Sequence, residues 1–174
     1  MKTAIVTALF GCALLIGPTA HAQQPAASNP LDVVPEQMPF NQPYGAPIAL
    51  DRAKEVAAAA EAEAKKRNWN MNIAVLDSGG NLVAFERMDG AQLASITISQ
   101  HKAHAALTYR RETKVFENGI NGGNPYLATL DGIIASRGGI PLVEGGKIIG
   151  AIGVSGGTGS QDEVVAKAGA ALIK

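Results

Sequence analysis

Two pairs of apolar segments, each joined by a short turn with two consecutive glycines, constrain the fold of this chain more than any other feature. The first pair is residues 71–76 and 82–87, and the second is residues 140–143 and 147–154. The first turn also contains Asp, Ser and Asn, which favour tight turns. Turns of this kind join neighbouring strands in antiparallel order. Each pair therefore predicts a β-hairpin, and the chain is expected to fold around an antiparallel sheet.

Three segments with helical spacing alternate with the two hairpins. They are residues 51–67, 92–111 and 160–173, and the first has alanines at intervals of four and three residues. We expect Asp51 to cap the first helix, and Ser160 to open the third in a capping box with the glutamate three residues later. The order helix, hairpin, helix, hairpin, helix predicts an α+β fold, with an antiparallel sheet and helices packed on its faces.

Residues 1–22 have the pattern of a cleaved signal peptide. Lys2 precedes an apolar run over residues 3–16, and small residues stand before the expected cleavage site after Ala22. This run is too short for a permanent membrane span, so we expect a periplasmic or secreted protein with no membrane association after cleavage. Cys12 leaves lipidation as an alternative, which the bulky Phe10 and the continuing apolar run disfavour.

Residues 23–49 are expected to form an extended arm. They contain six of the nine prolines, and proline at such spacing suppresses helix. The arm is either a flexible tether or a segment that lies across a neighbouring subunit, because residues such as Phe40 and Tyr44 are apolar for a simple spacer. Residues 50–174 then form one domain, which is long enough to bury a core of its own.

Composition excludes several classes of function. The chain has 15 basic and 15 acidic side chains and a formal net charge of zero, whereas nucleic-acid binding needs a basic face. Removal of Cys12, the sole cysteine, with the signal peptide leaves no thiol for disulfides or nucleophilic catalysis. Lys147 is followed by Ile148 rather than Ser or Thr, so the glycines form no nucleotide-binding P-loop.

Residues 153–157 match the G-x-S-x-G pattern of serine hydrolases. That mechanism needs a histidine to accept the serine proton, and no histidine follows Ser155. We therefore interpret the glycines as a tight strand-to-helix turn. The backbone N–H groups at Ser155 and Gly156 remain candidates for anion binding, although Asp162 and Glu163 already occupy the positive end of the next helix.

His101 and His104 are the two histidines that remain after cleavage. In the second predicted helix, His104 falls at the edge of an apolar face that includes Leu93, Ile96 and Leu107, with His101 further round. Without a third Cys or His they do not complete a structural zinc site. A single histidine is sufficient as an axial haem ligand. The alternative is a histidine at the core edge or in an interface.

A second apolar stripe, formed by Ile98, Ala105 and Tyr109 together with Lys102, lies on the opposite side of the same helix. A helix that is apolar on two sides is either enclosed within its own domain or buried by another subunit. Because the first stripe is assigned to the sheet, we expect a homo-oligomer. Lys102 would then be a partly buried amine or a side chain that extends to the surface.

Arg110, Arg111 and Lys114, with Thr113 between them, form a basic cluster after the second helix. Cations are common at helix C-termini because they interact favourably with the last carbonyl groups. The functional alternative is an edge that binds carboxylates, either haem propionates or a small organic acid. The glycine-rich segment 112–130 that follows is expected to be irregular.

Several segments resemble the GlcG/HbpS-like haem-binding family. They are residues 72–77 with Gly79 and Gly80, residues 85–91, Lys102 with Ala103, Thr113 with Lys114, residues 138–142, residues 150–156, residues 161–163, and Ala168 with Gly169. The resemblance implies a profilin-like domain that assembles into dimers or larger rings. It also implies binding of haem or a related tetrapyrrole in some members, without a catalytic residue set common to the family. Family helices commonly have Thr or Arg where this chain has His101 and His104.

We therefore expect an exported, oligomeric protein that binds a small molecule, with haem or a related tetrapyrrole as the first candidate. The predicted ligand-binding residues are His104, His101, Arg111, Thr113, Lys114, Ser155 and Gly156, with His104 as the axial ligand of haem iron. The alternative function is an enzyme that acts on a small hydroxy or keto acid. In that enzyme Lys102 with Asp162 or Glu163 would transfer protons.

Overall fold

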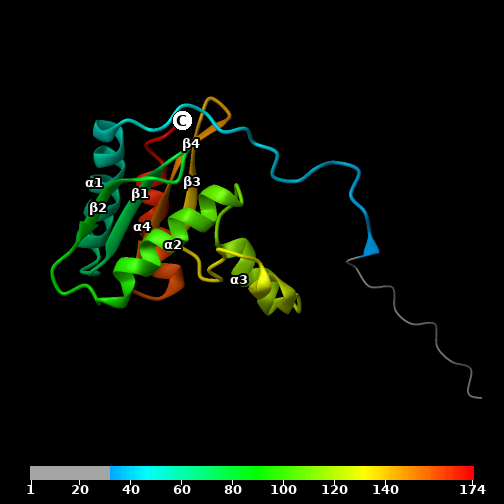
Figure 1. The fold of residues 1–174 in the computed structure, drawn as a ribbon. Coiled ribbons are helices and arrows are strands. Elements are labelled where there is room, and N and C mark those ends of the chain that lie inside the picture. Colours follow the sequence, from blue (N-terminus) through cyan, green and yellow to red (C-terminus); the bar gives the residue numbers. More distant parts are fainter. Residues whose placement is uncertain (1–31) are drawn as a thin grey trace, which may run out of the picture. The chain divides into compact units, whose positions relative to one another are not determined.

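The computed structural model describes residues 32–174, so the predicted signal peptide and the first part of the arm lie outside the described residues. Residues 37–174 form the unit considered below. Its elements, shown in Figure 1, are α1 (Leu50–Lys66), β1 (Asn72–Asp77), β2 (Leu82–Arg87), α2 (Ala94–Thr108), α3 (Lys114–Asn121), the 3₁₀ helix η2 (Pro125–Thr129), β3 (Gly139–Glu144), β4 (Lys147–Ser155) and α4 (Gly159–Ala170).

The four strands form one antiparallel sheet in the order β2-β1-β4-β3. Both predicted hairpins are present. Pairing of β1 with β4 joins them into one sheet, and Ile73 lies opposite Val154 in this pairing. Helices α1 and α4 pack on each other and share a buried apolar cluster with Ile73 and Val154. Helix α2 covers the other face, where Ala103 and Leu107 contact Leu76 and its neighbours. The predicted α+β fold is confirmed.

Helix α2 lies unusually close to the sheet because two glycines meet beneath it. Gly139 of β3 and Gly153 of β4 are directly opposite each other. A Cβ atom at Gly153 would overlap the Ser99 carbonyl and the Ala103 backbone, and one at Gly139 would overlap the Lys102 carbonyl. Only small side chains of α2 fit at this distance. The close contact therefore depends on the absence of side chains from the sheet.

The predicted assignment of the two α2 stripes is correct for Leu107 of the first stripe, which packs on the sheet, but not for Leu93. Leu93, expected on the sheet side, is 72% exposed, whereas Lys102 and Ala105 of the second stripe are buried within the chain itself. Tyr109 of that stripe packs edge-on against Phe116 of α3, with the ring centroids 5.2 Å apart. Lys102 and Ala105 are enclosed by the rest of the domain, and Ile98 and Tyr109 are half-buried, so the stripe by itself does not require another subunit.

The last part of the arm adds to the sheet of its own domain. The Ile148 N–H donates to the Pro43 carbonyl, and the Gly45 N–H donates to the Ile148 carbonyl. The Tyr44 hydroxyl also donates to the carbonyls of Leu107 and Thr108, 3.0 and 3.2 Å away, at the C-terminus of α2. These bonds satisfy carbonyl groups that a helix end leaves without partners. Residues from Pro43 onward therefore lie against the chain itself.

Local details at helix ends differ from the sequence-based expectations. Ala49 rather than Asp51 is the N-cap of α1, and it makes no side-chain capping bond. The capping box of α4 is formed by Thr158 and Gln161 instead of Ser160 and the glutamate after it. The segment expected to be irregular contains the two-turn helix α3 and the helix η2. The sequence contains two overlapping capping patterns, one starting at Thr158 and one at Ser160, and the residue pattern alone does not show which of them caps the helix.

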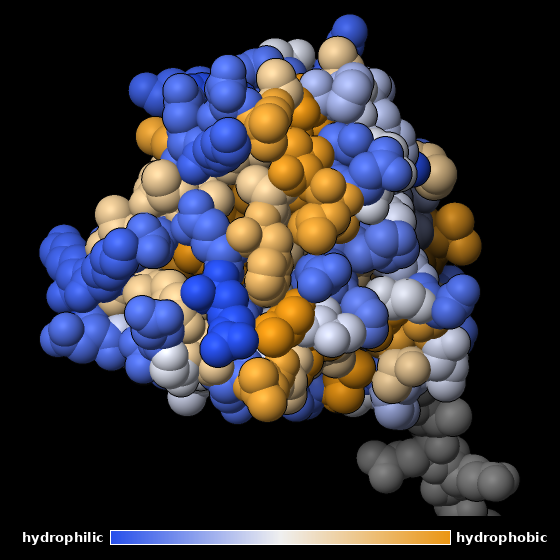
Figure 2. Space-filling model, turned by 60° about the vertical axis from the view of Figure 1, so that its left-hand side comes forward, coloured by the Kyte–Doolittle hydropathy of each residue, from blue (hydrophilic) through white to orange (hydrophobic). Residues whose placement is uncertain are grey.

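One face of the molecule has a prominent apolar band. Figure 2 turns the side of α1 and β2 forward and shows apolar side chains gathered between hydrophilic margins. Strand β2 is at the edge of the sheet, and Leu82 at its start is 49% exposed. Within residues 32–174, no helix is long and apolar enough to cross a membrane.

Candidate functional site

The two histidines lie on the outward side of α2, beside an open hollow. His101 and His104 line this hollow together with Gly132 and Ile133 of the segment after η2, and its volume is about 440 Å³. Both histidine side chains are exposed. Among residues 32–174, neither imidazole makes a hydrogen bond to protein within bonding distance. Helix α2 thus directs both rings to the surface beside this hollow rather than into the core.

The imidazole of His104 lies between two glycines. A Cβ atom at Gly132 would be 3.9 Å from its Nδ1, and a Cβ atom at Gly80 would be 3.9 Å from its Cδ2. Both glycines have a positive φ, of 70° and 85°, which other residues adopt only with strain. Nδ1 and Cδ2 are therefore flanked by Gly132 and Gly80, whereas Nε2 is at the end of the ring away from the backbone. The 440 Å³ hollow is within the range of small-molecule sites.

Directly below the histidines, on the inward side of α2, Lys102 forms a buried ion pair with Asp162 of α4. Lys102 Nζ lies 2.6 Å from Asp162 Oδ2, and the two side chains are 1% and 3% exposed. The Gly157 N–H donates to Asp162 Oδ1 at 3.0 Å. Burial raises the pKa of Asp162, and the ammonium of Lys102 counteracts this effect. Asp162 was one of two acidic partners considered for Lys102 in proton transfer, but both side chains are buried, and the pair joins α2 to α4.

Thr113 forms hydrogen bonds that hold the fold together. Its hydroxyl donates to the Ser136 carbonyl at 2.8 Å and accepts from the Gly139 N–H at 2.9 Å. The Thr113 N–H also donates to the Gly139 carbonyl. The residue is fully buried, so these bonds anchor the start of α3 to the beginning of β3. The structure places Thr113 away from the histidine hollow.

Lys114 and Glu163 belong to a surface cluster of ion pairs. Lys114 Nζ is 2.8 Å from Glu112 and 3.2 Å from Glu163, and its hydrogen bonds to these carboxylates raise the pKa of Lys114. Arg137 and Lys167 also pair with Glu163. Burial alone would raise the pKa of Glu163, but the hydrogen bonds from Lys167 and Lys114 outweigh it and lower that pKa. Glu163 is therefore held as a carboxylate by three cations.

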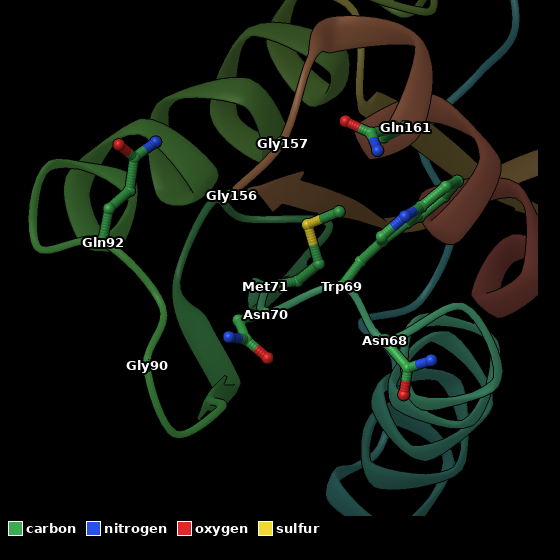
Figure 3. Close-up of a pocket in the computed structure, with 9 residues that line it drawn as sticks. All are labelled: Asn68, Trp69, Asn70, Met71, Gly90, Gln92, Gly156, Gly157 and Gln161. Atoms are coloured by element: carbon green, nitrogen blue, oxygen red, sulfur yellow. The ribbon is translucent and has the colours of Figure 1, made fainter.

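Ser155 ends β4 and is followed by Gly156, at the opposite end of the sheet from the first hairpin turn. The Ser155 hydroxyl is buried and donates to the Ser95 hydroxyl at 2.9 Å, so it contacts no base. Gly156 lines a hollow of about 330 Å³. Figure 3 shows that Trp69 and Gln161 lie on one side of this hollow and Gln92 on the other. The structure therefore does not bring Ser155 or Gly156 to the histidines.

Arg111 lines a third hollow, at the C-terminus of α2. Its guanidinium lies over the ring of Phe40, with the Cζ atom 3.6 Å from the ring centroid. Burial lowers the pKa of Arg111. The hollow has a volume of about 350 Å³. Thr108, which also lines it, is one helical turn beyond His104, so these two hollows are neighbours along α2.

Arg137 and Asn72 were not identified from the sequence, because their contacts and burial are visible only in the folded structure. Arg137 bonds to Glu117 through both its side chain and its backbone N–H, each at 2.8 Å. Asn72 is fully buried, and its Oδ1 has no hydrogen-bond partner among the described residues. No group of three or more His, Cys, Asp or Glu within residues 32–174 is arranged to hold a metal ion. A lone histidine ligand to a metal-containing cofactor is a separate case, because the cofactor supplies the other ligands.

The fold and the site define a small α+β domain that presents a histidine-lined hollow on the outward side of its second helix. Residues 48–171 match the family model described as "Haem degrading protein HbpS-like". The chain belongs to this HbpS-like family, which confirms the resemblance noted in the sequence.

Comparisons with individual proteins agree with this membership. Protein GlcG of Escherichia coli is 47% identical over 108 residues, which are 62% of this chain and 81% of GlcG. The crystal structure of an HbpS double mutant from Streptomyces reticuli has a TM-score of 0.69 at 28% identity, covering 88% of this chain and 99% of that chain. The PduOC:heme complex has a TM-score of 0.67 at 23% identity, covering 74% and 96%. At that identity the last likeness concerns the fold alone.

Proposed function

We propose that this protein binds haem or a related tetrapyrrole in the hollow beside α2, with His104 as the axial ligand and His101 as the second candidate. The observation that supports the proposal most directly is the pair of exposed imidazoles that share one open hollow of about 440 Å³. Membership of a family described by haem chemistry adds to it, as does the haem-bound protein of similar fold. Haem, when bound, would supply an iron centre that accepts the histidine nitrogen.

The residues present fit this group chemically. Neither imidazole makes a hydrogen bond within residues 32–174, so no internal partner would have to be displaced for His104 to hold the group. The glycines at positions 80 and 132 add no side-chain bulk next to the ring. Ile133 supplies apolar surface on the side of the hollow opposite α2. A planar apolar ligand with one metal coordination site matches this arrangement.

A haem titration followed in the Soret region tests the proposal. We expect saturable binding with a shifted Soret band, at least tenfold weaker binding in His104→Ala, and a smaller loss in His101→Ala. Lys54→Met, at an exposed position of α1, is the control and should bind as the wild type does. The absence of a Soret shift, or an identical shift in the double histidine variant, would disprove the assignment.

The proposal includes export and self-association. Cleavage after Ala22 would deliver the mature chain to the periplasm or the medium, and N-terminal sequencing of the fractionated protein should then begin at Gln23. The apolar band in Figure 2 and the edge strand β2 are surfaces that a second copy can cover. Light scattering of the purified protein should give a mass that is a multiple of the mature chain; a monomer would refute this part.

A further inference from the structure

The hollow at the C-terminus of α2 contains two arginines without carboxylate partners. It is lined by residues 38–40 of the arm and residues 108–111, with a volume of about 350 Å³. In the described part of the chain, neither Arg110 nor Arg111 lies within ion-pair distance of an acidic side chain. The acidic residue next in sequence, Glu112, is already paired with Lys114 at 2.8 Å. The hollow therefore holds two positive charges that no acidic side chain of residues 32–174 neutralises.

Most of the donors of these guanidinium groups remain unused. Arg111 Nε donates to the Tyr109 carbonyl at 2.9 Å, and Arg110 Nη1 donates to the Gln42 carbonyl at 3.3 Å. Each guanidinium has five N–H donors arranged as a planar fork. The two bonds hold the side chains in place, and the remaining donors are available to a carboxylate, which a guanidinium can bind through two parallel hydrogen bonds.

Arg111 is also partly removed from water. Its guanidinium lies 3.6 Å from the Phe40 ring centroid and 5.5 Å from that of Phe116. Aromatic faces attract a cation, but they do not replace a counter-ion. A half-buried cation gains more from an anion than an exposed one does, because water screens the interaction less. The aromatic contacts therefore strengthen the case for an anionic ligand at this position.

The backbone at Arg110 gives an independent indication of function. Arg110 directly follows the C-cap of α2 and has a φ of 54°. The Arg111 N–H donates to the Ala106 carbonyl and closes the helix end. Glycine is the usual residue at this position because other residues are strained there. Phe40, on the other side of the hollow, also has a positive φ, of 57°. Strain of this kind is often retained at ligand sites.

We propose that Arg110 and Arg111 form a binding site for the carboxylate group of a small organic anion, which residues 38–40 of the arm help to enclose. Two sources share this chemistry: a free carboxylic acid with a few carbon atoms, and a propionate of a tetrapyrrole bound in the neighbouring histidine hollow. The first source is independent of the proposed function. The second rests on it, because the propionate would belong to a tetrapyrrole bound beside His104. Thr108 at this site is one helical turn from His104.

Succinate binding to the full mature chain tests the first source, by calorimetry and by thermal unfolding, with sodium chloride at the same ionic strength as the reference. We expect saturable binding that is at least tenfold weaker in Arg110→Gly and in Arg111→Gln. Arg87→Gln, at an exposed arginine of β2, is the matched control and should bind succinate normally. Arg110→Gly should keep or raise the unfolding temperature of the ligand-free protein, because glycine relieves the strain.

Haem and its dimethyl ester test the second source. If the arginines hold a propionate, esterification and Arg110→Gly should each weaken haem binding by a similar factor, and the two effects should not add. Succinate binding without haem binding would refute the proposed function and leave the anion site intact. The anion site is overturned if wild-type protein binds no succinate and haem binding is indifferent to both changes, or if Arg110→Gly binds succinate normally.

Discussion

Replacing Lys102 by methionine should destabilise the protein strongly and in a pH-dependent way. The change retains most of the aliphatic volume of a fully buried side chain and removes only the ammonium group. Asp162 would then keep its bond from the Gly157 N–H, 3.0 Å long, but lose a cation 2.6 Å away. Removal of one partner from a buried ion pair costs about 3–5 kcal/mol. At about 2–4 °C per kcal/mol for a domain of this size, the melting temperature should fall by roughly 6–20 °C.

The sign of the pH dependence follows from Asp162. Burial already raises its pKa in the presence of Lys102, and without the cation the pKa should rise further. A carboxyl group whose pKa is higher in the folded than in the unfolded state contributes stability that is lost as pH rises through the folded value. The deficit of Lys102→Met relative to the wild type should therefore be larger at pH 7.5 than at pH 5, because protonation of Asp162 removes the unpaired buried charge.

Urea unfolding monitored by the fluorescence of Trp69, the sole tryptophan, measures both effects. Lys54→Met, at an exposed position, is the matched control and should change the free energy of unfolding by less than about 0.5 kcal/mol. The double variant Lys102→Met/Asp162→Asn should recover part of the loss at pH 7.5. A loss below about 1 kcal/mol at that pH, or a deficit that grows toward acid, would refute the reasoning.

Three further perturbations test the packing, the helix start and the surface ion pairs. Gly153→Ala should cost more than about 3 kcal/mol in urea unfolding, because its Cβ would overlap the backbone of α2 at Ser99. Thr158→Ala should cost about 1 kcal/mol through loss of the α4 cap, whereas Ser160→Ala should be nearly neutral; equal losses would contradict the observed capping box. The lowered pKa of Glu163 contributes stability that is lost as pH falls below about 4.5, so Glu163→Gln should flatten the acid side of the stability profile.

The fold could be predicted because its main signals are local. Each hairpin is specified by a few glycine-rich turn residues between apolar segments, and the structure forms both of them with the antiparallel pairing expected. The orientation of α2 could not be predicted in the same way. Hydrophobic spacing assigns both Leu93 and Leu107 to the sheet, and Leu107 does pack there, but Leu93 is only the N-cap of α2 and is 72% exposed.

In the candidate site, too, the features that depend on residues distant in sequence could not be predicted. The sequence left Asp162 and Glu163 as alternative partners of Lys102, and the burial of the pair with Asp162 depends on how α2, β3 and α4 pack together. Lys114 was expected near a ligand carboxylate and instead pairs with the protein's own Glu112 and Glu163. Its partners are up to 49 residues distant in sequence, so no local pattern contains this information. Arg111 directly precedes Glu112, but Glu112 pairs with Lys114, and Arg111 has no acidic partner among residues 32–174.

The two sides of α2 meet different physical demands, and this difference allows a clean test of ligand binding. The inward side is fixed by contact with the sheet and by the buried ion pair, so substitutions there change stability. The outward side has exposed imidazoles without protein partners in the described residues, so truncating them removes no packing. We therefore expect His101→Ala/His104→Ala to unfold in urea within about 0.5 kcal/mol of the wild type. A loss of haem binding in that variant then reports on the ligand, whereas a loss of stability above 2 kcal/mol would mean that the histidines support the fold.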